Sequence, residues 1–255
     1  MVIFLLENSL IKKLTQTLVV ILLYSFGANA QDKETVINKV WDAVGGKTNF
    51  EKARYFQFTF ASERNGKLNP GRTHLWDKFT GNYRLESETA DGKKSVVLFN
   101  TNTKTGKAFE NGVQIPDSTA NKLVIRAYAA FINDTYWLLV PTKLQDPGVN
   151  TKLESDEIIN NEDCFVINLN FDKVGLTPGD QYWLYISRTN GQVVRWKYLL
   201  QNQKNSSVLD WAPYQELGQG VKLSTKKTNT TNNSSIVFPL AKVLESVDQN
   251  IFIKP

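Results

Sequence analysis

The chain of 255 residues contains one cysteine and one histidine, and these two shortages restrict its chemistry. Cys164 has no second thiol with which to form an intramolecular disulfide, so stability has to come from packing. Glu162 and Asp163 precede it, and their negative charge disfavours a thiolate. An apolar strand pattern follows. We therefore expect Cys164 to be a buried, inert thiol rather than a nucleophile.

The sequence also lacks the usual motifs of enzymes. It has no nucleophile elbow, no HExxH motif and no glycine-rich phosphate loop. His74 lies three residues before Asp77 in an expected strand, so the two side chains should point to opposite faces, with His74 at the surface or a rim. We expect no catalytic residues, no metal and no cofactor. A hydrolase with two carboxylates far apart in sequence stays open as the enzymatic alternative.

Long basic stretches are absent as well. The formal net charge is +5, and after residue 30 the longest basic clusters are the pairs Lys93-Lys94 and Lys226-Lys227. Nucleic-acid binding requires a basic stripe or patch that follows the phosphates. The sequence therefore predicts no nucleic-acid partner.

The N-terminus has the order of a cleavable secretory signal. Lys12 and Lys13 precede the apolar run from Leu18 to Phe26, and Ala28-Asn29-Ala30 supplies a small-x-small cleavage site. The apolar run is shorter than the roughly 20 residues of a membrane-spanning helix. We expect residues 1–30 to be the signal peptide and residues 31–255 to be one exported domain with no transmembrane span.

Hydrophobic periodicity predicts two amphipathic helices. Apolar residues recur at helical spacing from Glu34 to Val44, with Asp32 as a candidate cap and Gly45-Gly46 as the stop. A second helix is expected from Ser118 to Asn133. The aromatic run that follows it ends at Pro141.

Most of the remaining chain alternates apolar and polar residues with period two, which predicts strands with one buried face. Phe56, Phe58 and Phe60 share a face in one strand, and Val194, Trp196, Tyr198 and Leu200 do so in another. Turn signals such as Asn65-Gly66 and Asn111-Gly112 join neighbouring strands and favour antiparallel pairing. The predicted fold is mainly β (α+β), a single large curved antiparallel sheet or half-open β-barrel with two amphipathic helices as lid or plug.

Several motifs resemble an uncharacterised family of exported proteins from Gram-negative bacteria. They are Gly45-Gly46 after the first helix, His74–Arg84 (HLWDKFTGNYR), Tyr136–Val149 (YWLLVPTKLQDPGV) and Val174–Tyr182 (VGLTPGDQY). That family is similar to the LolA-like and LolB-like outer-membrane lipoprotein carriers. The resemblance implies an incomplete antiparallel barrel with a helical lid over an apolar cavity for acyl chains, and it implies no catalytic residues.

On this resemblance, residues 118–133 are the lid helix, and Tyr136–Val140 is the segment by which the chain returns to the barrel. The expected ligand-binding residues are Phe58, Trp76, Leu123, Phe131, Trp137 and Trp196. The alternative is that Trp137 and its neighbours are ordinary core. We also expect the Trp76 ring inside the barrel and the Asp77 carboxylate outside it, paired with Arg84.

The leading hypothesis is a non-enzymatic periplasmic protein, in solution or peripheral at the outer membrane. It would bind a lipid or lipoprotein acyl chain as a carrier or chaperone. The alternative is a protein-interaction module with a filled barrel, whose partner is an outer-membrane or other envelope protein. The sequence identifies neither the ligand nor the partner, and it gives neither the oligomeric state nor the state of the cavity.

Overall fold

A computed structural model describes residues 32–89, 91–172 and 179–255. The expected signal peptide, residues 1–30, lies outside the described residues, and so do residues 174–178 of the last motif. The chain divides into two units, Met1–Thr35 and Val36–Pro255. In the first, the expected helix cap is present, because Glu34 N donates to Asp32 Oδ1 over 2.6 Å.

Helices occupy a small part of the described chain. The α-helices are α2 (Lys33–Val44), α3 (Lys47–Lys52) and α4 (Asp117–Leu139), and the short 3-10 helices are η1 (Val140–Thr142) and η2 (Gln249–Phe252). The expected stop of the first helix is confirmed, since Gly46 N donates to Trp41 O and both glycines have positive φ. The six-residue helix α3 was not predicted.

The alternating segments form strands, as expected. Before α4 the strands are β1 (Tyr55–Arg64), β2 (Lys67–Leu68), β3 (Arg72–Asp77), β4 (Asn82–Glu88), β5 (Lys94–Asn100), β6 (Gly106–Glu110) and β7 (Val113–Gln114). After it come β8 (Val149–Ile159), β9 (Glu162–Phe171), β10 (Gln181–Ser187), β11 (Val193–Leu199), β12 (Ser207–Trp211), β13 (Gln215–Gly218), β14 (Val221–Leu223), β15 (Lys226–Asn229), β16 (Ser234–Val237) and β17 (Ala241–Leu244).

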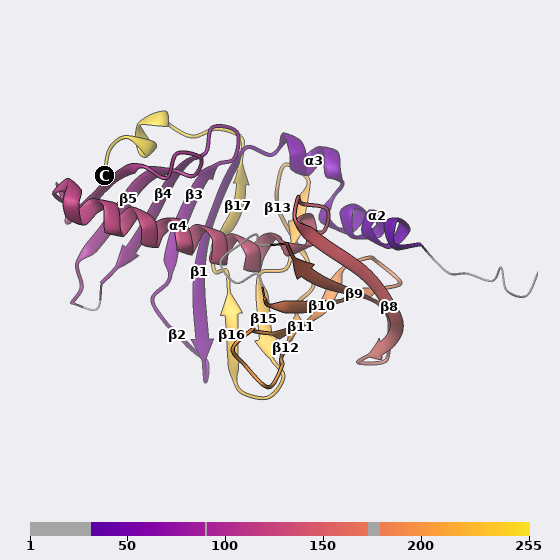
Figure 1. The fold of residues 1–255 in the computed structure, drawn as a ribbon. Helices are drawn as coiled ribbons and strands as arrows, with labels where there is room; N and C mark the ends of the chain where they lie inside the picture. The colour runs from indigo at the N-terminus through magenta and orange to yellow at the C-terminus, as the bar shows by residue number, and fades with distance from the viewer. Residues whose placement is uncertain (1–31, 90, 173–178) are drawn as a thin grey trace, which may run out of the picture. The chain divides into compact units, whose positions relative to one another are not determined.

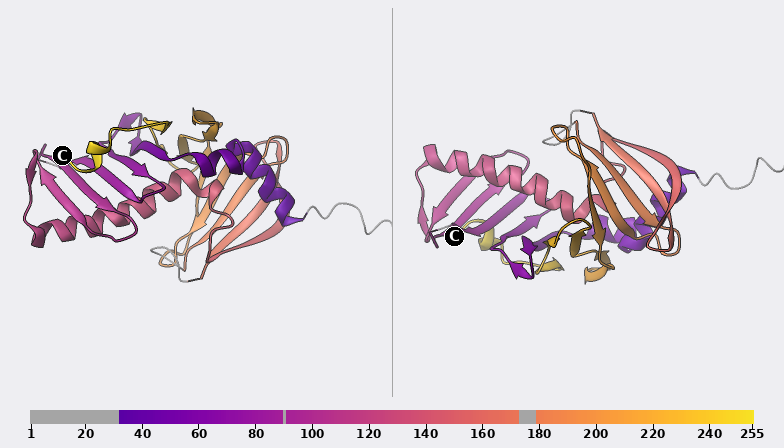
Figure 2. Two further views of the ribbon diagram at one scale, coloured as in Figure 1. Left: turned by 90° about the horizontal axis from the view of Figure 1, so that it is seen from above. Right: turned by 90° about the horizontal axis from the view of Figure 1, so that it is seen from below.

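Fifteen of these strands form one antiparallel sheet in the order β7-β6-β5-β4-β3-β1-β16-β15-β12-β11-β10-β9-β8, with β2 and β17 also paired to β1. The Asn65-Gly66 and Asn111-Gly112 turns have positive φ at both residues, as two-residue hairpin turns require. The two views of Figure 2 show that the strands near β3–β5 and those near β8–β12 run in different directions, so the sheet is strongly curved. Among the described strands, β7 and β8 pair on one side only, and the sheet is not closed.

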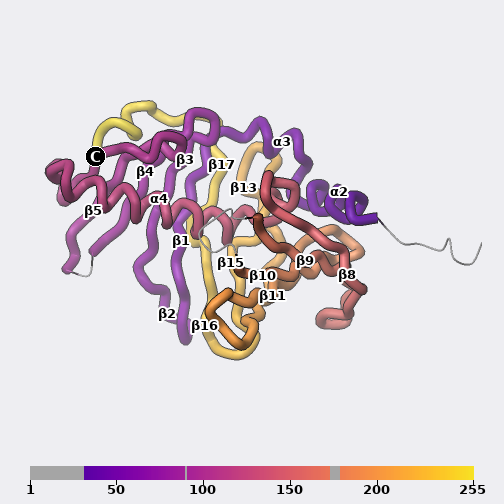
Figure 3. The backbone as a smooth tube through the Cα atoms, viewed as in Figure 1, coloured from indigo at the N-terminus to yellow at the C-terminus, as the bar shows by residue number. Residues whose placement is uncertain are grey.

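Helix α4 joins the two ends of this sheet. It follows β7 in sequence and precedes β8, the two strands at opposite ends of the order. Figure 1 shows it crossing β5, β4, β3 and β1, and Figure 3 traces the chain from its end into β8. Its first half packs Ala120, Val124 and Ala127 against β4–β6, and its second half places Leu138 and Leu139 against β1. This arrangement is the curved antiparallel sheet with a helical lid that the sequence predicted.

The expected end of the lid helix was wrong. The helix continues for six residues beyond Asn133, so Tyr136–Leu139 belongs to its last turns rather than to a returning segment. The polar Asn133-Asp134-Thr135 suggests a helix end in sequence, but each side chain has a partner here. Asp134 is fully buried in an ion pair, and the Thr135 hydroxyl donates to the carbonyl of Phe131.

A buried polar cluster fixes α4 to the sheet. Asp134 accepts two hydrogen bonds from Arg72 of β3, over 2.9 and 2.8 Å. His74 Nε2 lies 3.0 Å from Asp134 Oδ2, and His74 Nδ1 lies 2.7 Å from the hydroxyl of Tyr83. Burial alone raises the pKa of the Asp134 carboxyl, but the contacts with His74 and Arg72 outweigh it, and the pKa lies below its ordinary value.

Two expectations about β3 are therefore corrected. His74 is not at the surface or a rim: it is fully buried and stacks on Phe58 at 4.5 Å. Asp77 is also buried, and it pairs with Arg54 over 2.8 Å instead of Arg84. Because Asp77 is the last residue of β3, its carboxylate accepts the N–H groups of the following turn and needs a cation beside it.

Cys164 lies in a small buried cluster. The thiol is free and fully buried beside Ile159, Val166 and Tyr185. Burial raises its pKa to about 11, so the thiol is protonated at neutral pH. The expectation of a buried Cys164 is confirmed.

Replacing Asp134 by Ala should lower the free energy of unfolding by roughly 2–3 kcal/mol, because it removes the bidentate partner of Arg72 and leaves the buried His74 ring without its carboxylate. The matched control is Asp117→Ala at the exposed start of the same helix, where the loss should stay below about 1 kcal/mol. Urea unfolding followed by tryptophan fluorescence measures both. Equal losses in the two variants would contradict the anchoring role of Asp134.

Stability should also depend on pH through His74, the one histidine of the chain. Burial lowers the pKa of His74 in the folded protein, so the unfolded chain binds the proton more tightly. The stabilisation is then fully present above the unfolded pKa of about 6.5 and is lost as the pH falls below it, by at most about 1.4 kcal/mol per pH unit. Urea titrations between pH 7.5 and 5.5 should show this fall in the natural chain. In the His74→Gln variant, the free energy of unfolding should depend less on pH. An unchanged dependence would show that other groups cause it.

Candidate functional site

A cavity of about 510 Å³ lies beside the last turns of α4. Its volume is within the range of about 300–1,000 Å³ typical of small-molecule sites. The helix, the loop after it, and the strands β8–β11 or residues adjoining them contribute the walls. The lining residues are Phe131, Ile132, Asn133, Thr135, Tyr136, Trp137, Lys143, Asp146, Pro147, Val149, Phe171, Asp180, Tyr182, Trp196, Tyr198 and Leu200.

Aromatic rings dominate this cavity, with seven among the sixteen lining residues. The Trp137 and Trp196 ring centroids are 4.6 Å apart, and Tyr136 lies 5.8 Å from both Trp196 and Tyr182. Such tilted ring pairs stabilise each other beyond their area burial. The rings of α4 and of β10–β11 therefore form one continuous apolar wall.

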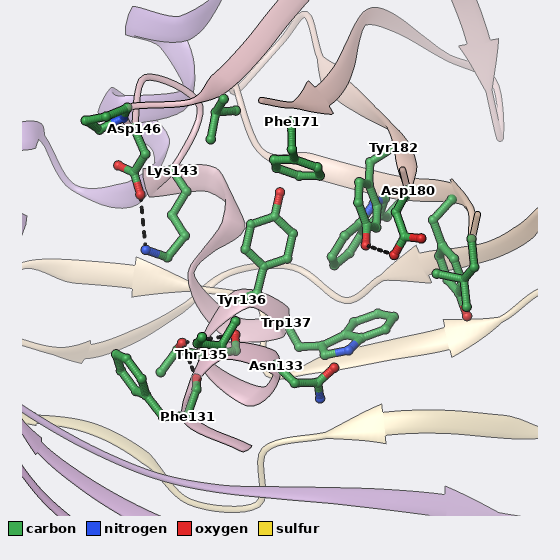
Figure 4. A pocket seen from close by; sticks show the side chains of 16 residues that line it. Phe131, Asn133, Thr135, Tyr136, Trp137, Lys143, Asp146, Phe171, Asp180 and Tyr182 are labelled. Atoms are coloured by element: carbon green, nitrogen blue, oxygen red, sulfur yellow. Dashed lines mark hydrogen bonds and ion pairs between the residues drawn. The ribbon is translucent and has the colours of Figure 1, made fainter. Parts of the chain in front are cut away.

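Register explains why rings from separate strands meet here. Tyr182 of β10 is directly opposite Tyr198 of β11, and Trp196 lies two residues before Tyr198 on the same face. On the helix side, Tyr136 and Trp137 project from the turn that follows the buried Asp134. Figure 4 shows the Tyr136 ring standing between α4 and Phe171, with the Trp137 ring beside it.

Charged groups are few, and those present have partners. Lys143 Nζ lies 3.2 Å from Asp146 Oδ2. Asp180 is buried and accepts hydrogen bonds from the Tyr182 hydroxyl at 3.0 Å and from Gln201 N at 2.8 Å. These pairs leave the interior of the cavity largely to rings and aliphatic chains.

Three of the six expected ligand-binding residues line the cavity: Phe131, Trp137 and Trp196. Phe58 is buried against His74 and Phe238, and Trp76 packs on Phe56 and Phe131. Leu123 lies in the first half of α4 and packs against the cluster over β4–β6. None of these last three residues lines the cavity, although Trp76 contacts the lining residue Phe131.

Sequence reasoning missed four rings of the lining: Tyr136, Phe171, Tyr182 and Tyr198. The signal for Tyr198 was present, since it alternates with Trp196 on one face. Tyr136 was assigned to a returning segment, which hid its place on the helix face. Tyr182 and Phe171 require the pairing of β10 with its neighbours, and a single sequence does not give that pairing.

Chemically active groups are scarce in the part of the chain that the structure describes. No cluster of three or more His, Cys, Asp or Glu side chains there is arranged to hold a metal ion. His74 lies in the buried cluster under α4, and Cys164 belongs to a separate buried cluster. Within the described ranges, no helix is long and apolar enough to cross a membrane.

No family model matches the chain, and no curated protein matches it. Solved structures do show similarity. A DUF1329 family protein from Desulfovibrio piger is 12% identical with a TM-score of 0.48, covering 86% of this chain and 96% of its own. A LolA superfamily protein from Nitrosomonas europaea is 12% identical with a TM-score of 0.46, covering 84% and 95%.

A third similar structure, an outer membrane lipoprotein-sorting protein domain from Vibrio parahaemolyticus, is 9% identical with a TM-score of 0.46 and covers 87% and 97%. These likenesses concern the fold and assign neither a ligand nor a partner. One of the similar structures is thus a LolA superfamily protein. The sequence motifs resemble an exported family that is itself similar to the LolA-like carriers.

Proposed function

We propose that the protein binds the acyl chain of a lipid or lipoprotein in this cavity and acts as a non-enzymatic carrier or chaperone. The observation that carries the proposal is the aromatic cavity of about 510 Å³ beside the lid helix. Each buried methylene contributes about 0.8 kcal/mol, so a chain of about ten methylenes contributes roughly 8 kcal/mol before the costs of ordering. Binding of this kind depends on apolar area, and discrimination between chain lengths is weak.

Export supports the same proposal. The expected signal peptide sends the chain to the periplasm, where acyl chains that move between membranes need cover from water. Helix α4 forms one wall of the cavity, and η1 and the loop around Lys143 connect this wall to β8.

The alternative is an interaction module of the cell envelope that pairs through a sheet edge. Strand β8 is eleven residues long and has one neighbour among the described strands. A register shift between Glu154 and Glu157 interrupts this edge, which discourages pairing with another chain. The interrupted edge of β8 and the presence of the aromatic cavity therefore favour ligand binding over edge pairing.

Native mass spectrometry of the protein purified from a Gram-negative periplasm tests the proposal. We expect a reproducible mass excess that organic extraction identifies as lipid. A ligand-free mass that stays unchanged after incubation with phospholipid and lipoprotein would contradict the proposal. Recovery of one stoichiometric envelope protein with such lipid-free material would support the alternative.

A charge placed in the cavity should weaken lipid uptake while the fold survives. Ile132→Glu introduces a carboxylate at a half-buried lining position, and binding of a phospholipid should weaken at least about tenfold because the carboxylate needs water. Ile125→Glu is the matched control, since Ile125 lies seven residues earlier on the same helix and is 68% exposed. The fluorescence of Trp137 and Trp196 reports binding. Equal uptake by both folded variants would remove α4 from the binding site.

A further inference from the structure

Two residues that line the cavity each have a polar atom without a partner. The hydroxyl of Tyr136 and Nε1 of Trp196 are buried, and neither atom forms a hydrogen bond with any described residue. Both residues line the cavity. A buried donor without an acceptor costs free energy, and native proteins contain few of them. Trp76 Nε1 and Trp211 Nε1 are also buried without a partner, but neither residue lines the cavity. Tyr136 and Trp196 differ from them because they line a space that can hold a ligand, and such a ligand can supply the missing acceptor.

The neighbouring hydroxyl of Tyr182 shows the contrast. It lines the same cavity, yet it donates to Asp180 Oδ2 over 3.0 Å. Figure 4 shows the Tyr136 hydroxyl at the far end of its ring, next to Phe171 and separate from the Asp180–Tyr182 pair. The ring edge of Phe171, 6.0 Å away between centroids, offers this hydroxyl no acceptor. Of these two tyrosine hydroxyls, the one of Tyr136 therefore remains available to a ligand.

The charges of the lining limit what the acceptor can be. Lys143 is the one cation among the described lining residues, and its ammonium is paired with Asp146. Asp180 adds a second carboxylate. An anionic head group would thus meet two carboxylates and no unpaired cation, and its desolvation would not be compensated. The unpartnered donors, a phenol and an indole N–H, are neutral and suit a neutral acceptor.

From these observations we infer that the cavity selects a neutral acyl carbonyl, that of an ester or an amide, over a free carboxylate. The carbonyl oxygen accepts a hydrogen bond from the Tyr136 hydroxyl, and the acyl chain lies along Trp137, Trp196 and Tyr198. The inference rests on the proposed function, since it specifies the ligand class of the same cavity. A glycerolipid ester and an N-acyl amide share this carbonyl.

Four probes with the same chain length test the selection: methyl dodecanoate, N-methyldodecanamide, ionised dodecanoate at pH 8, and dodecane. Their affinities are measured by displacement of a fluorescent apolar dye from the full-length mature protein. In the natural chain we expect the ester or the amide, or both, to bind more tightly than dodecanoate. Tyr136→Phe should weaken the carbonyl probes about tenfold and leave dodecane within about twofold, because it removes one hydroxyl and no apolar area.

Tyr214→Phe is the matched control. Tyr214 is a half-buried tyrosine outside the lining, and its hydroxyl accepts a hydrogen bond from Val193 N over 3.2 Å. This control should lose thermal stability and keep all four affinities. Tyr136→Phe should keep its stability without ligand, since its hydroxyl has no bond to lose.

The outcomes separate the two proposals. If dodecane binds but Tyr136→Phe leaves the carbonyl probes unchanged, or if dodecanoate binds most tightly, the selection for a neutral carbonyl is overturned and the apolar cavity stands. If none of the probes binds, both proposals fail. A loss of stability in Tyr136→Phe equal to that in Tyr214→Phe would also overturn the inference, because it would show that the hydroxyl is already bonded in the free protein.

Discussion

The ion pair between Asp134 and Arg72 is the contact on which the rest of the structure depends. It holds the lid helix against β3 at the middle of a sheet whose two end strands are joined in sequence by that helix. An apolar contact alone would let α4 slide or rotate, whereas a bidentate bond to a fully buried carboxylate fixes both position and rotation. His74 adds a second contact to the same carboxylate and links it to Tyr83 of β4. The helix therefore sits over the sheet in one register.

That register determines what the helix presents to the cavity. Tyr136 and Trp137 follow Asp134 by two and three residues. At about 100° per residue, Tyr136 lies on nearly the opposite side of the helix from Asp134 and Trp137 lies about 60° from it, so the direction of the carboxylate fixes the directions of both rings. They meet Trp196 and Tyr182, which the pairing of β10 with β11 has placed on one face. The last turns of α4 thus contribute both to the buried ion pair, through Asp134, and to the aromatic wall, through Tyr136 and Trp137. A change at Asp134 would thus reach the cavity without any direct contact with a ligand.

Much of the fold could be predicted from the sequence because it depends on local patterns. Period-two alternation and Asn-Gly turns predict antiparallel strands, and the structure has both. The failures occur where tertiary contacts override a local signal. Asn133-Asp134-Thr135 suggests a helix end, but burial of Asp134 beside Arg72 keeps the helix intact. Val194 was expected on the face of Trp196, yet a register shift between β10 and β11 turns it toward the Cys164 cluster. Three of the six expected ligand-binding residues line the cavity. Phe58 is core and Trp76 and Leu123 pack against core clusters, since large apolar residues occupy both environments.

The Tyr136 hydroxyl differs from the buried carboxylates of the surrounding core. Those carboxylates are paired with arginines: Asp77 with Arg54, and Asp134 with Arg72. In the cavity, the Tyr136 hydroxyl has no partner, although a phenylalanine would fill the same volume without an unmet hydrogen bond. If the wall only excluded water, a phenylalanine at this position would make the protein more stable. A wall that recognises a ligand needs a donor held ready and free of internal bonds, because a donor already paired within the protein would have to break that pair first. The unpartnered hydroxyl is thus better explained by recognition than by packing.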